Sequence, residues 1–179
     1  MKRTTKPLVI LTNDPSITAW GYAVVTSHES VLDVGCIKTD AQNKVRRIRK
    51  GDDTARRICE INQHLLRIID LFHVDYLLSE LPHGSQSASA AVMIGIVTGV
   101  AQTLSDALKI PIEWYSEGDA KKHLLGRISA SKEEIRKEVN KLYHVPWTGV
   151  KYKDEAIADA MAVYHAASIE SSFLKYYRL

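Results

Sequence analysis

Residues 7–25 read PLVILTNDPSITAWGYAVV, and this stretch decides how the rest of the chain is interpreted. The apolar run that starts at Leu8 predicts a buried strand, yet it ends on a carboxylate, Asp14, followed directly by Pro15. The next apolar stretch, 20–26, predicts a second strand after a short polar turn. A charged acid at the end of a buried strand is costly unless it has a partner. Asp14 is therefore either a turn residue bonded to nearby amides or part of a functional site.

The order of the predicted elements indicates an α/β protein with a mixed sheet. Three strands joined by short polar connectors come first, as in an antiparallel meander, at residues 8–14, 20–26 and 31–38. Helices and strands then alternate, which adds two parallel strands: helix 54–72 with Asp53 or Thr54 as its N-cap, strand 74–80, helix 85–109 and strand 110–116. Helical pieces at 119–125 and 131–142, a loop at 144–153 and a helix from Asp154 to Ser168 or beyond complete the chain. We expect a five-stranded mixed sheet flanked by helices, in one domain over residues 1–179.

The composition is that of an ordinary globular protein, with 45% hydrophobic and 25% charged residues. A net charge of +3 permits a polyanionic partner without requiring one. The two cysteines, Cys36 and Cys59, make no disulfide framework, and no Cys/His cluster has the spacing of a zinc site. Residues 84–105 carry no formal charge and contain Gly95-x-x-x-Gly99, a spacing that also packs membrane helices. Because this segment opens with Ser and Gln and has few large apolar residues, we expect a buried, closely packed helix of a soluble protein and no membrane span.

Further acids follow the pattern of Asp14. Glu80 also ends an apolar strand, so it would emerge at the same sheet edge if the two strands are neighbours; alternatively it is a solvated strand end. In the last helix, Glu155 and Asp159 lie four residues apart on one face. Capping and the helix dipole explain Asp154 and Glu155, but not Asp159, whose alanine neighbours leave room for something to approach. Converging carboxylates of this kind predict a site for a divalent cation, Mg²⁺ or Mn²⁺.

Four segments in this order resemble the RuvC family of Holliday junction resolvases, within the RNase H-like (retroviral integrase) superfamily. The resemblance extends over residues 7–168 and lies in ILTNDPSITAWGYAVV, LLSELPHGSQSASAAVMIGIVTGV, DAKKHLLGRISASKEEIRKEV and ADAMAV. It implies an RNase H-like fold and a nuclease that cuts two strands of a four-way DNA junction in paired nicks. It also implies a homodimer and about two Mg²⁺ or Mn²⁺ ions in each active site.

The resemblance implies metal ligands at Asp14, Glu80 and Asp159. The fourth acid of the family lies three residues before the last one, where this chain has Ala156; Glu155 is the expected substitute and Asp154 the fallback.

Basic residues are expected to contact the DNA. Lys121 and Lys132 match lysines that approach the scissile strand, with Lys122 in place of Lys121 if the register shifts by one; the alternative for each is a solvated surface lysine. His83 stands where the family presents a stacking aromatic side chain, or it is an ordinary loop histidine. A basic run suits contacts to the DNA arms, unless it is a solvated loop: Lys44, Arg46, Arg47, Arg49 and Lys50, followed by Arg56 and Arg57.

We expect the protein in the cytoplasm of a bacterial or phage-infected cell. Three rival functions remain open at this point: another RNase H-like nuclease acting on flaps, branched DNA or RNA–DNA hybrids, a non-catalytic DNA-binding module, and an actin-like small-molecule kinase. The presence of Asp14, Glu80 and Asp159 argues against the second, and the scattered glycines argue against the third.

Overall fold

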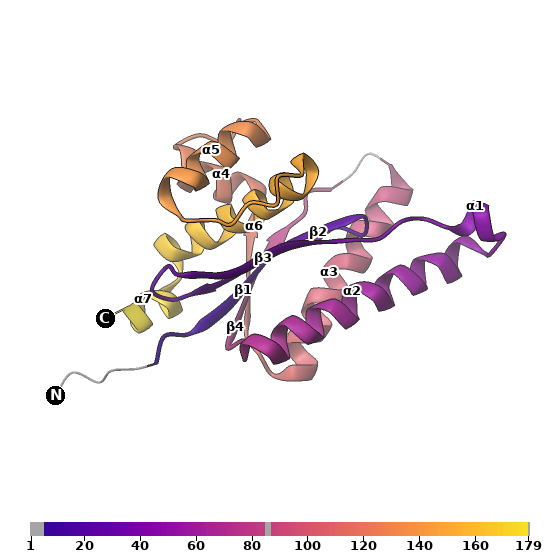
Figure 1. Cartoon of the computed structure of the whole chain (residues 1–179), viewed down its shortest axis with the longest axis horizontal. Coiled ribbons are helices and arrows are strands. Elements are labelled where there is room, and N and C mark those ends of the chain that lie inside the picture. Colours follow the sequence, from indigo (N-terminus) through magenta and orange to yellow (C-terminus); the bar gives the residue numbers. More distant parts are fainter. Residues whose placement is uncertain (1–5, 85–86, 179) are drawn as a thin grey trace.

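The computed structural model describes residues 6–84 and 87–178, and in them helices cover both faces of one five-stranded sheet (Figure 1). The strands are β1 (Val9–Asp14), β2 (Ala19–Thr26), β3 (Val31–Lys38), β4 (Tyr76–Leu81) and β5 (Ile112–Ser116). The helices are α1 (Asn43–Arg46), α2 (Lys50–Phe72), α3 (Ala88–Leu108), α4 (Glu117–Leu125), α5 (Lys132–Leu142), α6 (Lys151–Glu170) and α7 (Ser172–Arg178).

The sheet has the strand order β3-β2-β1-β4-β5, with β1 at its centre. β2 pairs antiparallel with both β1 and β3, whereas β1, β4 and β5 run parallel to one another. The prediction of three antiparallel strands followed by two parallel ones is therefore confirmed. Because parallel strands end on the same side, the carboxyl ends of β1, β4 and β5 meet at one edge of the sheet.

Two hydrophobic cores lie on the two faces of the sheet, and the central strands contribute to both. In β1, Ile10 faces the core formed with α4, α5 and α6, while Leu11 faces the core formed with α2 and α3. Leu78 and Leu77 divide in the same way in β4. This period-two alternation, in strands whose first residues are apolar on both faces, is typical of a sheet that is buried on both sides.

Helix α6 is buried on nearly all sides, and it packs on the sheet at very short range. The predicted stripe of Ile157, Met161, Tyr164 and Ser168 is buried, and so are the alanines between those residues. The helix can approach because Gly21 in β2 has no side chain: a Cβ there would overlap the backbone oxygen of Ala156. The small residues of α6 thus serve close packing of the helix on the sheet.

The boundaries of several helices differ from those expected. Helix α2 begins at Lys50, so neither Asp53 nor Thr54 is its N-cap. Asp53 lies in the first turn instead, where its carboxylate accepts hydrogen bonds from Gln42 N at 2.9 Å and from the Arg56 guanidinium at 2.8 Å. Helix α6 begins three residues before Asp154, and the short helices α1 and α7 were not predicted.

Helix α3 is less buried than its sequence suggested. It begins at Ala88 after the Ser87 N-cap, and residues 85–86 of the predicted helix lie outside the described residues. Val97, Val100 and Ala101 pack inward on the core with α2, but the space beside Gly95 and Gly99 is open and Val92 is 57% exposed. By length and hydropathy alone α3 is the one helix of the described residues that could cross a membrane. The expectation of a buried, closely packed helix is confirmed for the inner face alone, because the outer face is exposed.

Candidate active site

The carboxyl edge of the parallel strands brings Asp14 and Glu80 together. Asp14 is the last residue of β1, and the parallel register that pairs Asn13 with Ser79 places Glu80 beside it on β4. Behind Asp14, Asn13 ties three strands together: its amide donates to Leu78 O at 3.1 Å and its oxygen accepts from Trp20 Nε1 at 3.0 Å. The two acids thus stand on a rigid frame at the end of the central strand pair.

Helix α6 delivers a third acid, Asp159, to the same edge. Gly21 is the register partner of Asp14 on β2, and the backbone of α6 lies directly against Gly21 at Ala156. The hydroxyl of Thr12 donates to Ala160 O at 2.7 Å, which fixes the helix one residue beyond Asp159. The alanines beside Asp159 are fully buried against the sheet, so their small size serves the packing of the helix. The expectation that they leave room for a ligand was therefore wrong.

The charges of the three acids act on one another. Burial first, and then the neighbouring Asp159 carboxylate, raise the pKa of Asp14 to about 7, although the Lys132 ammonium opposes the rise. Burial, followed by Asp14 and Asp159, raises the pKa of Glu80 to about 9. Burial also raises the pKa of Asp159, again against Lys132. Carboxylates that resist ionisation in this way are stabilised by a bound cation.

A fourth acid, Glu117, lies close enough to act on the other three, and the sequence analysis missed it. It contributes to the raised pKa values of Asp14, Glu80 and Asp159, after burial and the nearer charges in each case. Glu117 follows β5 directly, at the carboxyl end of the third parallel strand. The reasoning that identified Asp14 and Glu80 as strand-end acids would have found it if it had been applied to β5.

Two lysines face this acid cluster, which we define as Asp14, Glu80, Glu117 and Asp159. Lys132, the first residue of α5, places its Nζ 2.7 Å from Asp159 Oδ2. Lys121 on α4 pairs with Glu117 one turn earlier on the same helix. Lys122 is exposed and its neighbour makes this ion pair, which favours Lys121 as the residue that faces the site. Between the two lysines, Gly126 ends α4 in a left-handed conformation, with φ of 72°.

Glu155 and Asp154 have different surroundings. The carboxylate of Asp154 is buried and accepts hydrogen bonds from Thr148 N at 2.8 Å, Thr148 Oγ1 at 2.7 Å and Gly149 N at 3.2 Å, so it holds the loop before α6. Glu155 lies one turn before Asp159 and is partly exposed; its carboxylate lies 3.9 Å from the Lys151 ammonium, and its charge also acts on Lys132. Of the two, Glu155 has the carboxylate that is free to bind a cation.

The remaining predicted DNA contacts lie at the surface. His83 follows β4 and places Nε2 3.7 Å from Glu117 Oε2, beside the acid cluster. Arg46 and Arg47 are exposed at α1, and Arg49 is paired with Asp52 at 2.7 Å. Figure 1 shows α1 and the start of α2 at the opposite end of the molecule from α4 and α5. The structure therefore does not bring these three arginines to the acid cluster.

The last two arginines of the basic run have structural roles. Arg56 bonds to Asp53, to Glu60 and to the backbone oxygen of Asp40. Arg57 donates to Thr39 Oγ1 at 2.8 Å and to Ile17 O at 3.0 Å. Arg57 thereby fixes the turn that follows Asp14, which is a contribution to the site that the sequence analysis did not foresee.

The donor set suits a hard divalent cation, but it is not preassembled. Oxygen ligands from carboxylates are those that Mg²⁺ and Mn²⁺ prefer, and the mutual repulsion of the acids favours a cation among them. In residues 6–84 and 87–178, however, no three side chains of metal-ligating type already converge on one point. The Lys132 ammonium is bound at Asp159 instead. The contact is made to Oδ2 alone, so the second carboxylate oxygen of Asp159 remains available.

Comparisons of the sequence identify relatives over most of the chain. A sequence profile of the family described as "Crossover junction endodeoxyribonuclease RuvC" matches residues 10–166. A protein of that name from Klebsiella pneumoniae (strain 342) is 29% identical over 160 residues, which are 88% of this chain and 86% of the relative. Its namesake from Photorhabdus laumondii subsp. laumondii is 28% identical with the same coverage.

Solved structures show the same fold. T. thermophilus RuvC in complex with Holliday junction substrate matches with a TM-score of 0.71 at 19% identity, covering 93% of this chain and 96% of that one. The yeast mitochondrial Holliday junction resolvase Ydc2 matches with a TM-score of 0.59 at 13% identity, covering 94% and 82%. These likenesses establish the RNase H-like arrangement of the sheet, and the profile covers most of the chain. The chain therefore belongs to the RuvC family of crossover junction endodeoxyribonucleases.

Proposed function

We propose that this chain resolves four-way DNA junctions by metal-dependent hydrolysis of phosphodiester bonds, giving paired nicks. The observation that carries the proposal is the acid cluster at a single sheet edge, where burial raises the pKa of Asp14, Glu80 and Asp159 and the charges of neighbouring acids raise each of these pKa values further. The family of the chain and the name of its T. thermophilus structural match support a four-way junction as the substrate.

Asp14, Glu80 and Asp159 are the proposed metal ligands, with Glu155 as the fourth. These residues would hold Mg²⁺ or Mn²⁺, two per site, with Asp14 as the central ligand, because Asp14 lies on the central strand and the charge of Asp159 acts on it. When bound, such ions lower the pKa of an attacking water and stabilise the departing 3′-oxygen.

The protein itself binds and orients the scissile phosphate. The Lys132 ammonium at Asp159 and the Lys121 ammonium at Glu117 are cations beside the acids, placed to bind non-bridging phosphate oxygens. Glu117 holds Lys121, and Asn13 and Arg57 keep the end of β1 rigid. His83 is the proposed stacking side chain, since it is exposed at the rim of the cluster. Arg46, Arg47, Arg49 and Lys122 remain proposed contacts to the DNA arms.

Two active sites are needed to cut a junction symmetrically, and a twofold dimer provides them. We assign the dimer contact to the outer face of α3, where Val92 is exposed and where Gly95 and Gly99 leave room for a second helix. An apolar cavity of about 630 Å³ between α2 and α3 continues this face. A family of bacterial relatives that act on DNA supports a location in the cytoplasm.

The decisive experiment compares a mobile four-way junction, a flap and an RNA–DNA hybrid of matched sequence, each with Mg²⁺, with Mn²⁺ and with EDTA. Paired nicks in the junction alone, dependent on the metal, support the proposal. Preferential cutting of the flap or hybrid would favour another RNase H-like nuclease, and junction binding without cleavage would favour a binding module. Asp14→Asn serves as the control for the active site: it removes a repulsive charge, so it should abolish cleavage while junction binding is retained or improved.

A further inference from the structure

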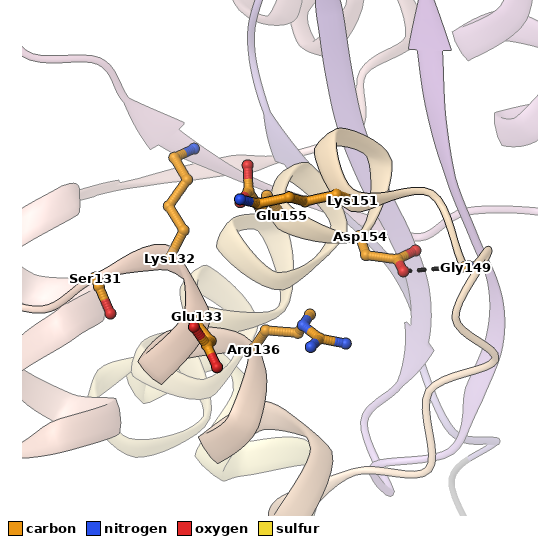
Figure 2. A pocket seen from close by; sticks show the side chains of 8 residues that line it. All are labelled: Ser131, Lys132, Glu133, Arg136, Gly149, Lys151, Asp154 and Glu155. Carbon is orange, nitrogen blue, oxygen red and sulfur yellow. Dashed lines mark hydrogen bonds and ion pairs between the residues drawn. The ribbon is translucent and has the colours of Figure 1, made fainter.

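A cavity of about 600 Å³ lies between the first turn of α5 and the first turn of α6 (Figure 2). Three basic side chains, Lys132, Arg136 and Lys151, contribute to its wall, together with Glu133, Asp154 and Glu155. Its volume is in the range of pockets that hold small ligands.

This cavity adjoins the acid cluster. The Lys132 side chain lines the cavity and also binds Asp159 through its Nζ at 2.7 Å. Glu155, on the opposite wall, lies one helical turn before Asp159 on α6. A DNA strand whose scissile phosphate lies at the acid cluster can therefore pass its next nucleotide over this cavity.

Two of the three acids of the wall, Glu133 and Asp154, are engaged with neighbouring groups. Glu133 pairs with Lys137 at 2.7 Å, on the same helix. Asp154 accepts three hydrogen bonds from Thr148 and Gly149. These contacts reduce the negative potential that the two carboxylates present to the cavity.

The basic side chains Arg136 and Lys151, in contrast, have N–H donors that are available to a ligand. Within residues 6–84 and 87–178, Arg136 makes no hydrogen bond or ion pair, although it is only partly exposed. Lys151 has a single loose contact, 3.9 Å to Glu155, and its side chain is 91% exposed. A guanidinium presents a planar fork of N–H donors that matches two phosphate oxygens.

We infer that this cavity is a subsite for a DNA backbone phosphate next to the scissile one on the cleaved strand, bound by Arg136 and Lys151. The inference rests on the proposed function and extends it, because neither residue belongs to the acid cluster or to the lysines that face it. Its effect is to fix the path of the cleaved strand as it leaves the active site.

The first test measures binding of a labelled four-way junction without divalent ions, as a function of salt, for Arg136→Gln, Lys151→Gln and the wild type. Each variant should lose about tenfold in affinity and reduce the salt dependence by about one phosphate contact. Two control variants remove the same charges elsewhere and should bind like the wild type. They are Arg67→Gln, on α2 across the sheet, and Lys141→Gln, on α5, where the native lysine pairs with Glu138. Circular dichroism establishes that all variants are folded.

The second test locates the contact. Single phosphates flanking the cleavage site are replaced, one at a time, by uncharged methylphosphonates. One replacement should weaken binding of the wild type but leave the affinity of Arg136→Gln unchanged, since the contact is already absent. If the losses from the variant and from every replacement simply add, or if the variants match the wild type, the cavity holds no phosphate and the inference is wrong.

Failure of the proposed function has a different signature. A wild-type protein that binds junctions but does not cut them with Mg²⁺ or Mn²⁺ contradicts the nuclease function and leaves the subsite to be decided by the binding data. A wild-type protein that binds no junction contradicts both.

Discussion

The Nζ of Lys132 lies 2.7 Å from Oδ2 of Asp159, and this ion pair joins α5 to α6 at the mouth of the acid cluster. Asp159 is buried, which raises its pKa, and Lys132 is the strongest influence in the opposite direction. The lysine thus opposes the rise in the pKa of Asp159 that burial causes.

We predict that Lys132→Gln raises the pKa of Asp159 further, because the opposing charge is gone. The pH profile of junction cleavage should move to higher pH, and the rate should fall at least tenfold because a phosphate ligand is lost as well. Measurement of single-turnover cleavage between pH 6 and 9.5 separates the two effects. Lys132→Arg retains the charge and should keep the midpoint of the wild type; an alkaline shift in this variant as well would show that charge is not the cause.

A second prediction concerns stability without metal. In the folded chain the pKa of Asp14 is about 7 and that of Glu80 about 9, against ordinary values of 3.8 and 4.5. Between these limits the folded chain retains protons that the unfolded chain has released, so the folded state loses stability as the pH rises from about 4 to about 9. The slope from these groups is up to about 1.4 kcal/mol per pH unit for each proton retained.

Urea unfolding in EDTA at several pH values measures this loss. The double variant Asp14→Asn/Glu80→Gln lacks both titrating groups and should show a shallower decline between pH 6 and 9. Millimolar Mg²⁺ should restore stability to the wild type at pH 8.5, since it binds the ionised acids, and should leave the double variant unchanged. If stability declines equally with pH in the two proteins, the raised pKa values of Asp14 and Glu80 are not the cause of the loss.

The helix that carries Asp159 supplies a third prediction. A methyl group at Gly21 would overlap the backbone oxygen of Ala156, and a backbone atom in a packed helix cannot move aside alone. Gly21→Ala should therefore push α6 away from β2, destabilise the protein by about 3 kcal/mol and strongly reduce cleavage in the fraction that remains folded. Chemical denaturation and cleavage assays below the melting temperature measure both effects. Gly51→Ala, in open space on α2, should be neutral or slightly stabilising.

The sequence predicted the sheet because its signals are local. An apolar run that ends in Asp14 or Glu80 is visible in a few residues, and the order of strands and helices fixes the mixed topology. The close contact between Gly21 and Ala156 is not visible in this way, because it joins residues that are distant in the chain. Glu117 shows a different limit: it lies one residue beyond the predicted strand 110–116, whereas Asp14 and Glu80 are the last residues of their predicted strands.

Asp53 and α3 show how tertiary context overrides a local pattern. Asp53 precedes the first apolar residue of a helical repeat, which is typical of an N-cap, yet α2 starts earlier and Asp53 accepts hydrogen bonds from Gln42 and Arg56. In α3 the absence of charge predicted a buried, closely packed helix. The chain alone covers only one side, so the other apolar face calls for a partner, and that face leads to the last prediction.

Val92→Glu should dissociate the proposed dimer. Val92 is 57% exposed on the outer face of α3 and lines the apolar cavity beside α2, so a carboxylate there would be buried without a partner in a twofold contact. Sedimentation velocity should show a monomer, and paired nicking should give way to slow single nicks because the two active sites are no longer held on one junction. Leu71→Glu places the same charge at an exposed leucine of α2 outside the proposed contact and should remain dimeric. If Val92→Glu sediments as a dimer like the wild type, the dimer contact lies on another surface. If the wild type is a monomer at the concentrations where it makes paired nicks, the proposed dimer does not exist.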